Sequence, residues 1–259
     1  MNIKSSVSFL KIIFAFQIIY HVVLWAMSDK FTIYNPLVFL PLCIMLIYGA
    51  FIGLLGINKV SIKNTQSVGL LFLSLGILSN GIAYSIYTYL AIKDITVVPS
   101  YPSVSDYIWL LSILFYILGY VVYIYIFRHS IKFQQIVISL FVCLISFYFI
   151  AYFIGLPEWS NQVGISLNEK FFDFFYSAFD FITIGLSIII LGVAGGRIYK
   201  GLFIFNIGIL LTGIADFILS VRGPENTWSG DWGDIIFSMT GYFTALGIVY
   251  LVNNLVDNS

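Results

Sequence analysis

The chain has 259 residues, of which 60% are hydrophobic and 9% are charged. A soluble domain normally contains about 25% charged residues, so this composition excludes an ordinary water-soluble protein and indicates that most of the chain lies in a lipid bilayer. The formal net charge is zero, and nothing in the sequence supports a nucleic-acid partner.

Eight apolar segments are long enough to cross a membrane as helices, because a spanning helix needs about 20 apolar residues. In chain order, we predict these helices at 7–27, 36–57, 67–92, 105–127, 135–155, 171–194, 201–221 and 234–253. The apolar runs are continuous, whereas the strands of a transmembrane barrel alternate apolar and polar residues. The predicted fold class is therefore all-α and polytopic. The first segment lacks a small-residue cleavage site after Met27, so we interpret it as a retained helix.

The basic residues predict the orientation of the protein, because Lys and Arg are retained in cytoplasmic loops. Eight helices place both termini on one side of the membrane. Eight of the twelve basic residues fall on that side, and most of the acidic residues fall on the other. We therefore predict a multi-pass protein of the cell membrane with cytoplasmic N- and C-termini and an acidic outer face.

The third and seventh predicted helices share a spacing of glycines. An offset of 132 residues superimposes three glycines of each helix: Gly69 on Gly201, Gly76 on Gly208 and Gly81 on Gly213. After the next loop, an offset of 128 places Asp106 on Asp234. Because the period is four helices, both halves would have the same orientation, with a pseudo-twofold axis along the membrane normal. We predict two parallel four-helix repeats, at 1–132 and 133–259.

Asp106 and Asp234 lie at the outer rim, where the fourth and eighth predicted helices begin. A carboxylate there can accept free backbone N–H groups and face the positive end of the helix dipole, although a ligand role is also open. Trp228 and Trp232 lie in the polar loop before the last helix. They either belong to the aromatic belt of the membrane interface or cover the mouth of a cavity.

The segment "YPSVSDYIWLLSILFYILGY" resembles part of the multi-helix N-terminal membrane regions that precede diguanylate cyclase or histidine kinase domains. Six residues match the pattern Tyr-Pro-Ser-x-x-Asp-x-x-Tyr/Trp-Leu: Tyr101, Pro102, Ser103, Asp106, Trp109 and Leu110. The resemblance implies a sensory input module. The chain stops shortly after the last predicted helix, so we expect no output domain of its own and a signal that passes to a separate protein.

Few strongly polar or ionisable residues interrupt the predicted helices: Gln17, His21, Asn80, Asp180, Asn206 and Asp216. A charged side chain at the bilayer centre costs about 2.5–3.5 kcal/mol on insertion scales, so such residues usually face the interior of the bundle. At a rise of about 1.5 Å per residue, Asp180 would lie near the middle of the membrane, and Asp216 and His21 in its outer third. The repeat places Asp216 where the first half has Tyr84.

These positions predict an outward-facing polar cavity lined by His21, Tyr84, Asp180 and Asp216, with Asn80 and Gln17 deeper. Such a site could bind a proton, a cation or an amine-bearing ligand, or act as a pH-sensitive switch. The alternative is that Asp216 lies close enough to the interface to be solvated and that His21 bonds a backbone carbonyl.

Three functions fit these features. The first is a sensory or ligand-binding membrane module, the second is a small transporter that uses Asp180 and Asp216, and the third is a structural accessory subunit of a membrane complex. No catalytic, nucleotide-binding or metal-binding motif is present, so we expect neither an enzyme nor a cofactor. The expected partners are the lipid bilayer and a membrane or cytoplasmic protein. Cys43 and Cys143 are interpreted as buried free thiols.

Overall fold

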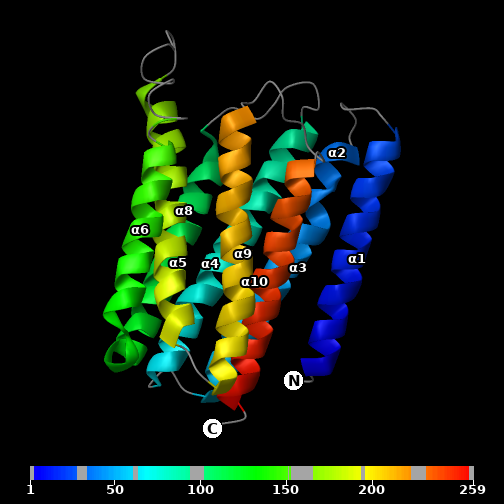
Figure 1. The fold of residues 1–259 in the computed structure, drawn as a ribbon. Coiled ribbons are helices and arrows are strands. Elements are labelled where there is room, and N and C mark those ends of the chain that lie inside the picture. Colours follow the sequence, from blue (N-terminus) through cyan, green and yellow to red (C-terminus); the bar gives the residue numbers. More distant parts are fainter. Residues whose placement is uncertain are drawn as a thin grey trace.

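A computed structural model describes residues 3–27, 34–60, 64–93, 102–150, 152, 166–193, 196–222 and 232–256. Over these residues the chain is a bundle of helices (Figure 1). The elements are α1 (Ile3–Met27), α2 (Tyr34–Leu37), α3 (Phe39–Val60), α4 (Thr65–Lys93), α5 (Val104–Phe127), the short 3-10 helix η1 (Arg128–Ser130), α6 (Phe133–Ile150), α8 (Leu167–Val193), α9 (Gly196–Arg222) and α10 (Trp232–Val256).

Seven of the described helices, α1, α3, α4, α5, α8, α9 and α10, are long and apolar enough to cross a membrane. The apolar part of α6, at Phe133–Phe149, is shorter. These helices lie at the eight predicted segments, so a multi-pass, all-helical membrane protein is the class of the chain. The start of α1 and the end of α10 lie at the same end of the bundle (Figure 1).

The second predicted segment differs from the structure at its start. The prediction was one helix over 36–57, whereas the chain forms the four-residue helix α2, a turn at Val38, and then α3. Pro41 explains the break: it has no N–H for the carbonyl of Leu37, and its ring would clash with that carbonyl in a continuous helix.

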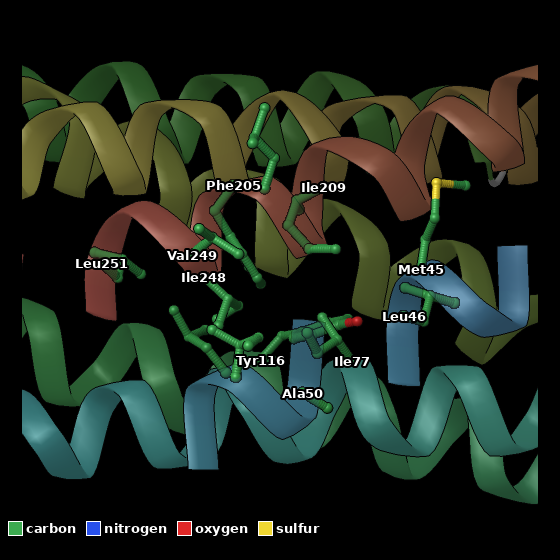
Figure 2. Packing of buried hydrophobic residues seen from close by; sticks show 14 of the residues in the cluster. Met45, Leu46, Ala50, Ile77, Tyr116, Phe205, Ile209, Ile248, Val249 and Leu251 are labelled. Carbon is green, nitrogen blue, oxygen red and sulfur yellow. The ribbon is translucent and has the colours of Figure 1, made fainter. Parts of the chain in front are cut away.

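Helices α3, α4, α9 and α10 are close-packed through the pairs α3–α4, α9–α10 and α3–α10, and α5 packs on α4. Helix α1 packs on α3 and α10 at one side of the bundle, and α6 packs on α8 at the other (Figure 1). Figure 2 shows the buried core between these helices, with Met45, Ile77, Tyr116, Phe205 and Ile248 contributed by α3, α4, α5, α9 and α10 in that order.

Glycines allow the closest approaches in the bundle. A Cβ atom added at Gly76 of α4 would lie 3.2 Å from the backbone oxygen of Ser112 on α5, and one added at Gly208 of α9 would lie 3.1 Å from the backbone oxygen of Thr240 on α10. Lipid supplies no hydrophobic force between helices, so such close backbone packing is a main source of their association. The pairs α4–α5 and α9–α10 therefore depend on these glycines.

A ladder of hydrogen bonds joins α6 to α8. Gln135 Nε2 donates to the Gly192 carbonyl oxygen at 2.5 Å, Ser139 Oγ donates to that of Gly185 at 2.7 Å, and Cys143 Sγ donates to that of Phe181 at 3.4 Å. The three donors are four residues apart, so they lie along one face of α6. We refer to these three bonds as the α6–α8 ladder.

Candidate functional site

Asp180 of α8 and Asp216 of α9 come together where these two helices cross. A Cβ atom at Gly213 of α9 would lie 3.7 Å from Asp180 Cβ, and Asp216 follows Gly213 by nearly one helical turn on the same face. The two carboxyl groups lie within hydrogen-bonding reach of each other. Asp180 is 6% exposed, and Asp216 is partly exposed.

The contacts of Asp180 leave part of its carboxyl group unsatisfied. Its Oδ2 atom has no hydrogen-bond partner among the described residues. Of the same residues, those that interact with the Asp180 carboxyl electrostatically are Asp216 and Tyr116, and neither is a cation. A buried carboxylate without a partner is costly. Two carboxylates in contact also repel each other and cannot share a hydrogen bond until one of them carries a proton. The pair is therefore suited to take up a proton or a cation.

Asn80 of α4 is hydrogen-bonded to two residues of α5, one of which is Tyr116. Trp109 Nε1 donates a hydrogen bond to Asn80 Oδ1 at 3.0 Å, and Asn80 Nδ2 donates to the Tyr116 hydroxyl at 3.5 Å. The Tyr116 hydroxyl also interacts electrostatically with Asp180. Tyr116 and Asn80 are both buried, so these bonds satisfy polar groups that would otherwise be costly inside the bundle.

Tyr84 of α4 contacts both Trp109 of α5 and Asp216 of α9. Its ring packs against three aromatic side chains, those of Phe39, Trp109 and Phe237, at centroid distances of 5.6, 5.1 and 6.2 Å. Its hydroxyl interacts electrostatically with Asp216, Asp234 and Cys43. We call the group formed by Asn80, Tyr84, Tyr116, Asp180 and Asp216 the acidic site.

His21 and Gln17 of α1 are fully buried, and their contacts lie toward α10 and the turn before α3. Gln17 Nε2 donates to the Val38 carbonyl oxygen at 2.6 Å and lies 3.3 Å from His21 Nε2. His21 Nε2 is 3.2 Å from Ser238 Oγ. Ser238 follows Phe237, which packs on Tyr84, and the place of His21 and Gln17 in the predicted cavity stays a prediction.

Asp106 caps α5. The Ser103 backbone N–H and Ser103 Oγ donate to Asp106 Oδ2 at 2.6 and 2.8 Å, and the Tyr176 hydroxyl of α8 lies 3.1 Å from Asp106 Oδ1. Asp234 lies in the first turn of α10 and is partly exposed. Trp232 is the first residue of α10. Trp228 lies outside the described residues, so the proposed roles of both tryptophans remain predictions.

Sequence reasoning missed the tyrosines of α5. Tyr116, Tyr120 and Tyr123 are buried on one face of this helix. The Tyr120 hydroxyl donates to Asn206 Oδ1, and Asn206 Nδ2 donates to the Ser187 carbonyl oxygen at 3.3 Å. The spacing of these tyrosines, at four and then three residues, is a signal that could have identified this face. Asn206 thus has its partners on α5 and α8.

Within the described ranges, no three His, Cys, Asp or Glu side chains gather as metal ligands would. Comparison of the chain with protein-family models, with curated proteins and with solved structures gives no significant match. The acidic site is therefore interpreted from its own geometry.

Proposed function

We propose that this protein is an integral membrane sensory module that takes up a proton or a small cation at the acidic site. The observation that carries the proposal is the contact between Asp180 and Asp216, with Asp180 Oδ2 buried and without a partner among the described residues. Buried ionisable residues in membrane proteins commonly mark ligand or proton sites. Uptake of a cation would remove the repulsion between α8 and α9 and so change how these helices pack.

We further propose the two-repeat organisation, which the helix contacts support. Gly76 packs on Ser112 as Gly208 packs on Thr240, and these positions are related by the offsets of 132 and 128 residues. A second correspondence concerns α3 and α8. Gly81 faces Ile47 of α3, and its counterpart Gly213 faces Ile184 of α8. Aligning Ile47 with Ile184 places Cys43 level with Asp180, while Tyr84 is level with Asp216.

The proposed orientation puts the acidic site in the outer half of the membrane. The start of α1 and the end of α10 share one end of the bundle, and eight of the twelve basic residues of the sequence fall on that side. Since basic residues favour the cytoplasm, the opposite end, where α5, α8 and α10 begin, would face outward. Asp216 is partly exposed and lies in the part of α9 that is nearer to that face.

The pH response expected of this site has a definite sign. Among the described residues, the titratable groups that face the pair include Tyr116 from α5, Tyr84 from α4, Asp234 from α10 through Tyr84, and Cys143 from α6, which bonds the carbonyl next to Asp180. With one shared proton, the pair holds α8 and α9 together. Loss of that proton leaves two carboxylates in contact. The free energy of unfolding should therefore fall as the pH rises.

The first test is thermal unfolding of the detergent-purified protein between about pH 5 and about pH 8. The wild-type melting temperature should fall across this range. The fall should be smaller for Asp180→Asn and Asp216→Asn, because the carboxylate that remains is still at least partly buried but no longer faces a second carboxylate. A full proton difference changes stability by at most about 1.4 kcal/mol per pH unit.

Asp106→Asn is the matched control, since Asp106 is also an aspartate of the outer end but caps α5. It should lower the melting temperature by a similar amount at every pH, because loss of a cap costs about 1 kcal/mol. If the melting temperature of the wild type changes with pH in the same way as those of Asp180→Asn and Asp216→Asn, the proposal is rejected. The structural accessory subunit is then favoured.

A small transporter is the second candidate function, and one observation favours it. The polar contacts continue from the acidic site along α5, where Tyr120 bonds Asn206 and Asn206 bonds the Ser187 carbonyl. A substrate path between two parallel repeats would need such groups. Substrate-dependent proton uptake into vesicles containing the protein, lost in Asp180→Asn, would identify this function.

A further inference from the structure

The connection between α5 and α6 carries a cluster of basic side chains. Arg128, His129 and Lys132 are close together in the chain, and all three are exposed. This connection lies at the end of the bundle that also holds the start of α1 and the end of α10 (Figure 1). The acidic residues that the structure describes all lie elsewhere in the bundle: Asp106, Glu169, Asp173, Asp180, Asp216 and Asp234. We call Arg128, His129 and Lys132 the basic corner.

Two sets of contacts hold the basic corner in place. The Arg128 guanidinium carbon lies 4.1 Å from the centroid of the Tyr125 ring, and Arg128 Nη1 donates to the Tyr125 carbonyl oxygen at 3.3 Å. The Lys132 backbone N–H donates to Gln135 Oε1 at 2.8 Å, and Gln135 Nε2 donates to the Gly192 carbonyl oxygen of α8. These contacts use one of the five N–H donors of Arg128. The remaining donors and the Lys132 ammonium have no acidic partner among the described residues.

The surface beside the basic corner is apolar and aromatic. Phe133, which follows Lys132, is 78% exposed, and Tyr125 is 59% exposed. Along the same face of α5, Val121 and Leu118 are 49% and 44% exposed, since residues three and four apart share one face of a helix. All of these side chains lie on the surface of the bundle, so an acyl chain can lie along them without a cavity.

The two kinds of surface together favour a phospholipid with a net negative charge. An Arg guanidinium can bind two phosphate oxygens at once, and Lys binds phosphate as a point charge. The headgroup of phosphatidylcholine carries a quaternary ammonium beside its phosphate, which would be repelled by the two cations. An acidic segment of a soluble protein would also match the charges, but it would leave Phe133 and the exposed face of α5 unused.

We infer that the basic corner binds the headgroup of an anionic phospholipid, with the phosphate at Arg128 and Lys132 and the acyl chains along the exposed faces of α5 and α6. This inference goes beyond the proposed function and depends on neither Asp180 nor Asp216. In the proposed orientation, the basic corner faces the cytoplasmic leaflet, whose anionic lipids attract basic segments next to membrane helices.

The test measures the melting temperature of the purified full chain in micelles of a nonionic detergent. Dioleoyl phosphatidylglycerol or dioleoyl phosphatidylcholine is added in steps. Phosphatidylglycerol should raise the melting temperature to a limiting value, because a ligand that binds the native state stabilises it by mass action. Phosphatidylcholine should give no saturable increase. Inorganic phosphate and polyglutamate at equal ionic strength should give none either, because they bring negative charge without acyl chains.

The variants separate the basic corner from general attraction between charges. Arg128→Gln and Lys132→Gln should each raise the phosphatidylglycerol concentration at half-maximal response about fivefold, and the double variant should lose the response. Lys59→Gln is the matched control, because Lys59 is an exposed basic residue in the last turn of α3 at the same end of the bundle. Lys59→Gln and Asp180→Asn should keep the wild-type response.

The side chains of Arg128, Lys132 and Lys59 are all exposed, so these variants should fold, and each response is measured against the melting temperature of the same variant without lipid. An equal response to phosphatidylcholine, a response retained in the double variant, or an equal loss in Lys59→Gln would overturn the inference. A saturable response to inorganic phosphate would assign the basic corner to a soluble phosphate compound, and one to polyglutamate would assign it to an acidic protein segment. Either result would overturn the lipid.

Discussion

The helix pairs α3–α4 and α8–α9 cross in a similar way but place different side chains at the crossing. Each pair crosses at a glycine, Gly81 in the first and Gly213 in the second. Beside Gly81, the chain places Cys43 and Tyr84, which are 4% and 8% exposed. Beside Gly213, it places Asp180 and Asp216. The backbone arrangement thus does not require carboxylates, because a thiol and a phenol serve at the corresponding place. Packing alone leaves the two aspartates unexplained, which is why we propose that they take up a proton or a cation.

A carboxylate introduced at the α3–α4 crossing should cause the largest loss of stability. Cys43→Asp would place a charge beside Tyr84 in a setting closed by Phe39. An uncompensated buried charge costs about 3–5 kcal/mol, so we expect a large loss of folded protein by size-exclusion chromatography and a lower melting temperature.

The reciprocal change, Asp180→Cys, is the control for this comparison. It removes one member of a repelling pair and restores the chemistry of the first crossing, so its melting temperature at neutral pH should equal or exceed that of the wild type. If Cys43→Asp melts like the wild type, the two crossings do not differ in their tolerance of charge.

A methyl group added at the glycine of each crossing should cause an intermediate loss of stability, and the loss should differ between the two crossings. In Gly81→Ala the new Cβ would lie 3.1 Å from Leu46 Cβ and 3.4 Å from the Ile47 backbone nitrogen, neither of which can rotate away. In Gly213→Ala the nearest atom, at 2.7 Å, is Cδ1 of Ile184, the end of a flexible side chain. Overpacking typically costs about 1–3 kcal/mol.

We therefore expect Gly81→Ala to lower the melting temperature more than Gly213→Ala does. The measurement is thermal unfolding of both variants at one pH at which the wild type is stable. The reverse order would mean that α8 and α9 are held together more rigidly than α3 and α4.

The smallest loss of stability should come from Trp109→Phe. This change removes the hydrogen bond to Asn80 Oδ1 but keeps an aromatic ring against Tyr84. A lost hydrogen bond of this kind costs about 1 kcal/mol. Because Trp109 does not titrate, melting curves at about pH 5 and about pH 8 should shift by the same amount. A changed pH dependence would place Trp109 within the proton-binding part of the acidic site.

The sequence predicted where the helices lie along the chain better than it predicted which residues contact one another. Apolar length and continuity are properties of one segment, so all eight segments could be located along the chain. The break at Val38 was missed because hydropathy does not register the missing N–H of Pro41. Asp180 and Asp216 stood out because charges inside apolar segments are costly.

The partners of these residues were harder to predict. The role of Tyr116 depends on which helices surround α5, and among 18 tyrosines no single one is distinguished by its type. Similarly, Gln17 and His21 were recognisable as buried polar residues on one face of a helix. Their contacts with the Val38 carbonyl and Ser238 depend on how α1 is placed against α3 and α10, which no local pattern contains.

The α6–α8 ladder has a mechanical consequence. Three side chains of α6 are bonded to backbone carbonyls of α8 between Phe181 and Gly192, so these two helices form a single stiff strut over that length. Asp180 lies immediately before the ladder. A force between Asp180 and Asp216 would therefore displace two helices as one rigid body. The displacement would reach the far end of the bundle along the strut without being absorbed by bending of α8 alone.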